Sequence, residues 1–187
     1  MTSLRLRSAG PGDAERVARL HADSWRRHYR GAYSDSFLAG DVAADRLAVW
    51  SARLSAQSGS LTLLAQEEGV EILAGFVHVV FDEDRKWGSL VDNLHVVHGR
   101  QRGGIGTVLL RRAAAAASER ALSDGVYLWV LEQNTAAQQF YRAMGGSPVQ
   151  KAVVAPPGGV PGRLNGSPNK LRFVWPEAAK LALAGEH

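Results

Sequence analysis

The sequence contains no cysteine among its 187 residues. This absence excludes disulfide bonds, thiolate metal sites and a cysteine nucleophile. Any acyl transfer by this chain must therefore use another nucleophile, or it must proceed by direct attack of the substrate on the acyl donor.

Long apolar runs are also missing. No run approaches the roughly 20 residues that a membrane-spanning helix requires. Residues 1–20 alternate charged and small apolar side chains, and they lack the apolar stretch of a signal peptide. We therefore expect a cytoplasmic protein with no membrane partner.

The charge of the chain is only weakly biased. Lysine and arginine total 22 against 18 aspartates and glutamates, a formal net charge of +4, which mildly favours anionic partners. The sequence shows neither a clustered basic helix nor an exposed aromatic platform, so we expect no nucleic-acid partner. The histidines and carboxylates form no grouping typical of metal ligands, so we also expect no metal.

What is present suits one globular domain. Hydrophobic residues make up 45% of the chain and charged residues 21%, which is enough to build a core at this length. No internal repeat is visible. We expect one domain over residues 1–176, followed by a C-terminal tail, residues 177–187, that either forms a terminal helix or frays.

Strand and helix patterns alternate along the chain. Strand patterns cover residues 4–7, 61–66, 72–81, 87–97, 126–131, 147–155 and 170–175. Helical spacing follows Asp13 to about residue 29, and it recurs at 41–56, 105–122 and 135–144. The fully apolar strand 126–131 must be interior. This order predicts an α/β fold with a mixed central sheet of about seven strands and helices on both faces. The Pro- and Gly-rich loop 156–169 is long for a hairpin, hence mobile or functional.

The most informative segment is the basic, glycine-rich turn Gln101-Arg102-Gly103-Gly104-Ile105-Gly106, which lies between a strand and a helix. Glycine lets a ligand approach the main chain, and the first N–H groups of the helix attract an anion. The turn lacks the Lys-Ser or Lys-Thr of a P-loop and the spacing of a dinucleotide fingerprint. It therefore favours a phosphate-bearing ligand of another class over an ordinary turn that binds nothing.

Two motifs in order carry a family resemblance. Leu94-His95-Val96 and the turn that follows resemble the acetyl-CoA signature of the GNAT acetyltransferases, Gln/Arg-x-x-Gly-x-Gly/Ala. Asn134, Phe140-Tyr141 and Gly145-Gly146 resemble the Asn…Phe-Tyr…Gly segment of the same family. The resemblance extends from the first strand to Trp175 and implies the GNAT fold, whose sheet is splayed at the acetyl-CoA site. It also implies an acetyl-CoA-dependent N-acetyltransferase that acetylates a primary amine of a small molecule or peptide by direct transfer.

The resemblance further implies which residues meet the acetyl-CoA. The main chain of Leu94, His95 and Val96 pairs with the pantetheine arm, and a backbone N–H there polarises the thioester carbonyl. The pyrophosphate is held by the turn and the helix start, which are Gln101, Arg102, Gly103, Gly104, Ile105, Gly106 and Thr107. Asn134 touches the cofactor arm, although capping of the helix at Thr135 would by itself explain this residue.

The proton transfers have candidates of unequal strength. Tyr141 is the candidate general acid, since a phenol can protonate a thiolate leaving group; its alternative is a core aromatic, a role that suits Phe140 better. In the family's ribosomal-protein acetylating branch a Glu stands five residues before the Asn, and here that position is Trp129. The remaining candidates for a base, or for a group that orients the amine, are Asp92, His95 and Glu132, and water is a further alternative.

The acceptor site has only weak signals. Trp25, Tyr29 and Tyr33 would form an aromatic wall for a cation or an apolar group, or they belong to the core. The sequence leaves open whether the late strands pair across a homodimer. Two other functions also stay open: an acetyl-CoA-binding regulatory or interaction module without catalytic activity, and a basic nucleic-acid-associated protein, which is the weaker of the two.

Overall fold

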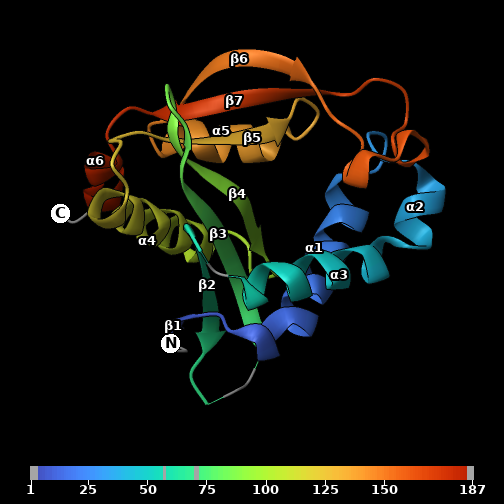
Figure 1. Cartoon of the computed structure of the whole chain (residues 1–187), viewed down its shortest axis with the longest axis horizontal. Coiled ribbons are helices and arrows are strands. Elements are labelled where there is room, and N and C mark those ends of the chain that lie inside the picture. Colours follow the sequence, from blue (N-terminus) through green and yellow to red (C-terminus); the bar gives the residue numbers. More distant parts are fainter. Residues whose placement is uncertain (1–3, 57, 70–71, 185–187) are drawn as a thin grey trace.

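Seven strands form one mixed sheet within the residues that the computed structural model describes, 4–56, 58–69 and 72–184 (Figure 1). The strand order is β1-β2-β3-β4-β5-β7-β6. The strands are β1 (Leu4–Ser8), β2 (Ser60–Glu67), β3 (Leu73–Asp84), β4 (Gly88–Val96), β5 (Val126–Leu131), β6 (Ser147–Val153) and β7 (Asn169–Trp175). The helices are α1 (Ala14–His28), α2 (Asp35–Ala39), α3 (Val42–Ser55), α4 (Ile105–Arg120), α5 (Thr135–Ala143) and α6 (Ala178–Leu183). The predicted mixed sheet with helices on both faces is confirmed.

The junction of β4 and β5 shapes the molecule. These two strands are parallel and pair only at Ser89 with Val126 and at Leu90 with Tyr127. Beyond this point β4 and β5 diverge, as the predicted splay requires. At the closed end a Cβ on Gly88 would overlap the Gly125 carbonyl, and Gly88 has a φ of +88°, which favours glycine.

Helices cover the two faces of the sheet. Figure 1 shows α4 and α6 on one side and α1, α2 and α3 on the other. Leu109 and Leu110 of α4 are fully buried against the sheet, and Ala178 and Leu181 of α6 are buried in the same core. Residues 185–187 of the predicted tail lie outside the described residues. No helix in the described part of the chain is long and apolar enough to cross a membrane.

The opposite face contains the polar part of the core. Trp50 of α3 and Phe76 of β3 are fully buried there, and His21 and His78 are buried beside them. The short helix α2 was not predicted. It begins where Ser34 Oγ accepts a hydrogen bond from the Phe37 N–H, and five residues are too few to show a helical period.

Candidate functional site

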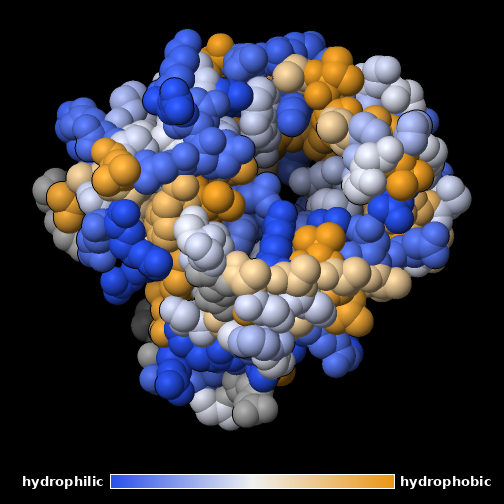
Figure 2. Space-filling view, viewed as in Figure 1, coloured by the Kyte–Doolittle hydropathy of each residue, from blue (hydrophilic) through white to orange (hydrophobic). Residues whose placement is uncertain are grey.

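A cavity of about 690 Å³ lies where β4 and β5 diverge, and its lining comes from α1, β4, the glycine-rich turn, β5 and α5. Figure 2 shows the molecule hollowed between the lobe of β5, β6 and β7 and helix α3, with hydrophilic side chains gathered around the hollow. Most of the predicted cofactor residues line this cavity: Leu94, His95, Val96, Gln101, Arg102, Gly104, Gly106, Thr107, Asn134 and Tyr141.

The glycine-rich turn lies at the cavity and leads directly into α4. Gly104 and Arg102 have φ angles of +82° and +66°, so the chain reverses tightly just before α4. The first hydrogen bond of the helix runs from the Val108 N–H to the Gly104 carbonyl. The N–H groups of the first turn therefore have no acceptor within the helix, which is the arrangement that binds an anion.

Two predicted residues of this turn do not line the cavity. Gly103 lies outside the lining, and Ile105 directs its side chain into the core beneath the sheet. Both remain within the turn, so any contact they make with a ligand would come from the main chain. The basic charge at the cavity comes from Arg102, an exposed residue.

The edge of β4 that faces β5 is open beyond Leu90. Leu94 and Val96 pair with β3 on the other edge, and their open edge has no strand partner among the described residues. An extended ligand with amide groups can pair with this main chain as an added half-strand would.

Helix α5 supplies two polar side chains. Asn134 Oδ1 accepts a hydrogen bond of 3.2 Å from the Ala137 N–H, so this residue caps α5 and lines the cavity at the same time. Tyr141 is 8% exposed. Burial, with a smaller contribution from nearby Tyr29, raises the pKa of Tyr141 above its usual range. Its phenol therefore stays protonated at neutral pH and can act as a proton donor.

His95 lines the cavity as a neutral imidazole. Its Nδ1 lies 2.7 Å from Ser24 Oγ, and its ring lies 4.6 Å from the His21 ring. Burial among these groups lowers the pKa of His95 to about 3. A group with so low a pKa is a weak proton acceptor for an amine.

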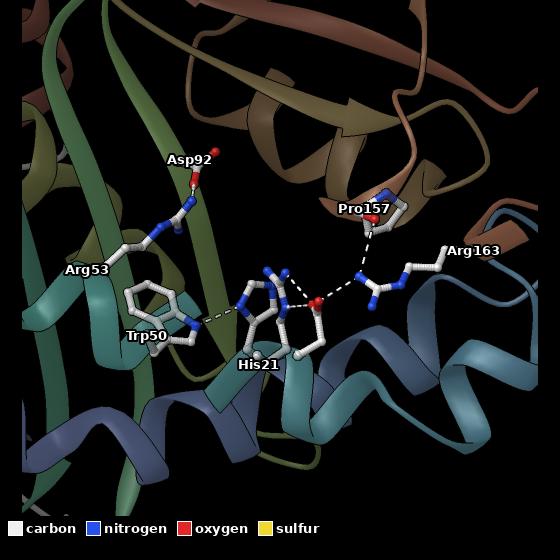
Figure 3. Close-up of polar contacts among 8 residues, drawn as sticks. His21, Trp50, Arg53, Asp92, Pro157 and Arg163 are labelled. Atoms are coloured by element: carbon white, nitrogen blue, oxygen red, sulfur yellow. Dashed lines mark hydrogen bonds and ion pairs between the residues drawn. The ribbon is translucent and has the colours of Figure 1, made fainter. Parts of the chain in front are cut away.

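Asp92 and Glu132 differ in their surroundings. Asp92 lines the cavity, and its Oδ2 lies 2.7 Å from Arg53 Nη2 (Figure 3). Its second oxygen points away from Arg53 and has no hydrogen-bond partner among the described residues. Glu132 lies outside the lining, because its two oxygens accept hydrogen bonds from Lys151 at 2.6 Å and Asn169 at 3.1 Å. These bonds lower the pKa of Glu132.

Of the three predicted aromatic residues of the acceptor wall, Tyr29 alone lines the cavity. Trp25 stacks on Tyr29 at 5.4 Å, and Tyr33 lies 4.9 Å from the same ring. Trp25 and Tyr33 are each 7% exposed, so they support Tyr29 from behind. The Arg46 guanidinium lies 4.2 Å from the Trp25 ring and closes the far side of this stack.

Hydrogen bonds hold the β6–β7 loop, residues 154–168, against α3 and the α1–α2 connection beside this aromatic group. Arg163 donates a 2.6 Å hydrogen bond to Asp45 of α3 and a 3.3 Å bond to the Pro157 carbonyl (Figure 3). The Asn165 N–H bonds to the Ala32 carbonyl at 2.8 Å. The loop that the sequence left as either mobile or functional is thus docked against the segment that carries the aromatic wall.

Several lining residues were not predicted from the sequence. Ser24 and His28 lie one helical turn apart on α1 and face the cavity beside Tyr29, so helical spacing was the available signal. Trp129 of β5 lines the cavity as well. The described residues contain no group of three or more histidines and carboxylates that could hold a metal ion.

Comparison with known proteins agrees with this geometry. The sequence model of the acetyltransferase (GNAT) family matches residues 18–145. A probable N-acetyltransferase of Mycobacterium tuberculosis is 30% identical over 143 residues, which cover 75% of this chain and 78% of that protein.

Solved structures share the fold at lower identity. The PaiA N-acetyltransferase of Thermoplasma acidophilum, solved with coenzyme A, aligns with a TM-score of 0.67 and 19% identity over 91% of this chain and 98% of its own. A variant of the spermidine N-acetyltransferase SpeG from Vibrio cholerae aligns with a TM-score of 0.66 and 17% identity over 95% of each chain. The family match, the related sequence and the splayed sheet agree, and the chain belongs to the GNAT family of N-acetyltransferases.

Proposed function

We propose that this enzyme transfers the acetyl group of acetyl-CoA directly to a primary amine of a small molecule or peptide. The observation that carries the proposal is the cavity at the β4–β5 splay, in which the N-terminus of α4, the open edge of β4 and the Tyr141 phenol converge. The spermidine N-acetyltransferase among the solved relatives has an amine acceptor in its name.

The residues present fit acetyl-CoA. The free N–H groups that begin α4 suit a pyrophosphate, and the open edge of β4 at Leu94 and Val96 suits the amides of a pantetheine arm. When bound, acetyl-CoA supplies the thioester whose acetyl carbon the amine attacks. The cavity continues from this edge toward Tyr29 and Asp92, which leaves room for an acceptor on the far side.

Each side chain then has a defined task. The bond between the amine nitrogen and the acetyl carbon forms, the carbon–sulfur bond breaks, and the nitrogen releases one proton to water. Tyr141 donates its proton to the departing thiolate from the neutral phenol, the form that burial favours, and the resulting phenolate regains a proton from water. Asp92 accepts a hydrogen bond from the amine through its free oxygen and orients the nitrogen. His95, held neutral, packs against Ser24 and adds no charge beside the developing oxyanion.

An acetyl-CoA-binding module without catalytic activity is the alternative. The related M. tuberculosis protein is described as a probable N-acetyltransferase, and Tyr141 is present at the cavity. Both observations favour an active enzyme over a module that only binds.

A pair of glycine variants tests the acetyl-CoA site. Gly104 and Gly59 have φ angles of +82° and +71°, and at neither position would the Cβ of an alanine meet another atom within 4 Å. Replacement of either by alanine introduces similar backbone strain of about 1–2 kcal/mol. We expect Gly104→Ala to weaken acetyl-CoA binding in calorimetric titration about tenfold, and Gly59→Ala to leave it unchanged. Equal affinities in both variants and the wild type would contradict acetyl-CoA binding at this turn.

A further inference from the structure

Two cations of β7 lie on one aromatic ring beside the cavity. Lys170 Nζ and Arg172 Cζ are each 4.5 Å from the centroid of the Trp129 ring. Trp129 lines the cavity, and it pairs with Arg172 across β5 and β7. Arg172 and Lys170 are two residues apart on one strand, so their side chains leave the same face of the sheet as Trp129.

Lys170 has no carboxylate partner in the described part of the chain, in contrast to Arg53, Arg172 and Lys151. Arg53 pairs with Asp92, and Arg172 lies 3.7 Å from Asp84. Lys151 pairs with Glu132. In the described part of the chain, Lys170 has no ion pair and no hydrogen bond from its ammonium; the contact that remains is the face of Trp129.

The surroundings of Lys170 make this charge costly. Its side chain is partly buried, and burial together with Arg172 lowers the pKa of Lys170, while Asp92 opposes that shift. A positive charge kept in such a place is stabilised when an anion binds it.

The cavity therefore has an anionic group in its lining and a cationic group beside it. Asp92, which lines the cavity, presents a carboxylate oxygen without a partner, and Lys170, on the face of the lining residue Trp129, presents an ammonium without a partner beside the cavity. We infer that the acceptor is an amino-carboxylate: its amine is held at Asp92, and its carboxylate is bound by Lys170 on Trp129. One ammonium without a partner matches a singly charged anion. This inference rests on the proposed acetyl transfer and names the class of its acceptor.

Matched pairs of acceptors test the inference. Each pair consists of an amino-carboxylate and the same amine without its carboxylate: L-phenylalanine and 2-phenylethylamine, L-methionine and 3-(methylthio)propylamine, 4-aminobutyrate and propylamine. Initial rates of acetylation are measured with saturating acetyl-CoA. We expect at least one pair in which the carboxylate member has a kcat/KM about tenfold or more above its partner, the value of a charge-assisted hydrogen bond.

Three lysine variants identify the source of this preference. Lys170→Met keeps an unbranched apolar stem on Trp129 and removes the charge. It should raise the KM of the carboxylate member about tenfold or more and leave the matched amine unchanged. Lys170→Arg should keep most of the preference. Lys180→Met, which changes an exposed lysine of α6 paired with Glu177, should behave as the wild type.

The outcomes separate this inference from the proposed function. Acetylation of the amines without any preference for the carboxylate members overturns the inference and leaves acetyl transfer standing. So does acetylation of peptide N-termini with no acetylation of free amino-carboxylates. A preference that survives in Lys170→Met overturns the role of Lys170. No acetylation of any amine or peptide overturns the inference and the proposed function together.

Discussion

The buried histidines on the α1–α3 side of the sheet should make the free energy of unfolding depend on pH, and His78 shows how large the effect is. His78 is 4% exposed, and its Nδ1 lies 2.8 Å from Thr62 Oγ1. Its ring meets the edge of Trp50 at 5.4 Å. Burial, with a smaller contribution from Arg53, lowers the pKa of His78 to about 4. The negative charge of Asp92 opposes this shift. The folded protein thus holds this imidazole neutral.

The sign follows from proton binding. In the unfolded chain, His78 binds a proton below a pH of about 6.5. In the folded chain, it binds a proton only below about pH 4. Stability is therefore fully present above pH 6.5, falls as the pH is lowered through this window, and levels off below pH 4. Between pH 7 and pH 5 the loss from this one residue is about 2 kcal/mol.

Urea unfolding at pH 7 and pH 5 measures this loss as a difference between proteins. His78→Gln keeps a hydrogen-bonding group for Thr62 and removes the titration. The drop in unfolding free energy from pH 7 to pH 5 should be about 2 kcal/mol smaller in this variant than in the wild type. Groups such as His21 and His95 titrate in both proteins and cancel in the comparison. His98→Gln, at an exposed position, is the control. Equal drops in the wild type and His78→Gln would refute the reasoning.

Three further predictions concern Tyr141, the closed end of the β4–β5 junction and the docking of the β6–β7 loop. Tyr141→Phe should lower kcat about a hundredfold with the acetyl-CoA affinity unchanged, and an unaltered kcat would remove Tyr141 from the role of acid. Gly88→Ala, which forces a Cβ against the Gly125 carbonyl, should lower the free energy of unfolding by about 2 kcal/mol or more; a smaller effect in urea would show that the strands can separate there. Asp45→Asn should loosen Arg163, speed proteolysis of the β6–β7 loop and raise the acceptor KM, while a loop as resistant as that of the wild type would contradict the docking.

Much of the fold followed from local patterns. The apolar run 126–131 after Gly125 predicted the exact bounds of β5, since a strand buried on both faces needs no alternation. By contrast, β3 extends to Asp84, beyond the predicted residue 81, because Asp84 pairs with Gly88 across the hairpin. Charged residues at the exposed end of a hairpin carry no hydrophobic signal. Short segments and strand ends are set by partners that the local sequence does not reveal.

The same distinction holds at the site. The glycine-rich turn and Tyr141 belong to compact motifs, so the sequence could single them out. Lys170 could not be predicted, because its significance depends on Trp129, which lies 41 positions earlier and comes alongside only through the pairing of β5 and β7. Glu132 was a candidate by its place at a strand end, yet Lys151 hydrogen-bonds its carboxylate outside the cavity. Such pairings between distant segments require the structure.

The release of free CoA in the presence of an amine tests the central claim most directly. Because the chain contains no cysteine, a thiol reagent detects the CoA thiol without any background from the protein. With acetyl-CoA and a panel of amines, amino-carboxylates and peptides, the account predicts one CoA released for each acetylated amine, and no release when the acceptor is omitted. Binding of acetyl-CoA with no CoA released for any acceptor would contradict it and would show a module that binds without transferring.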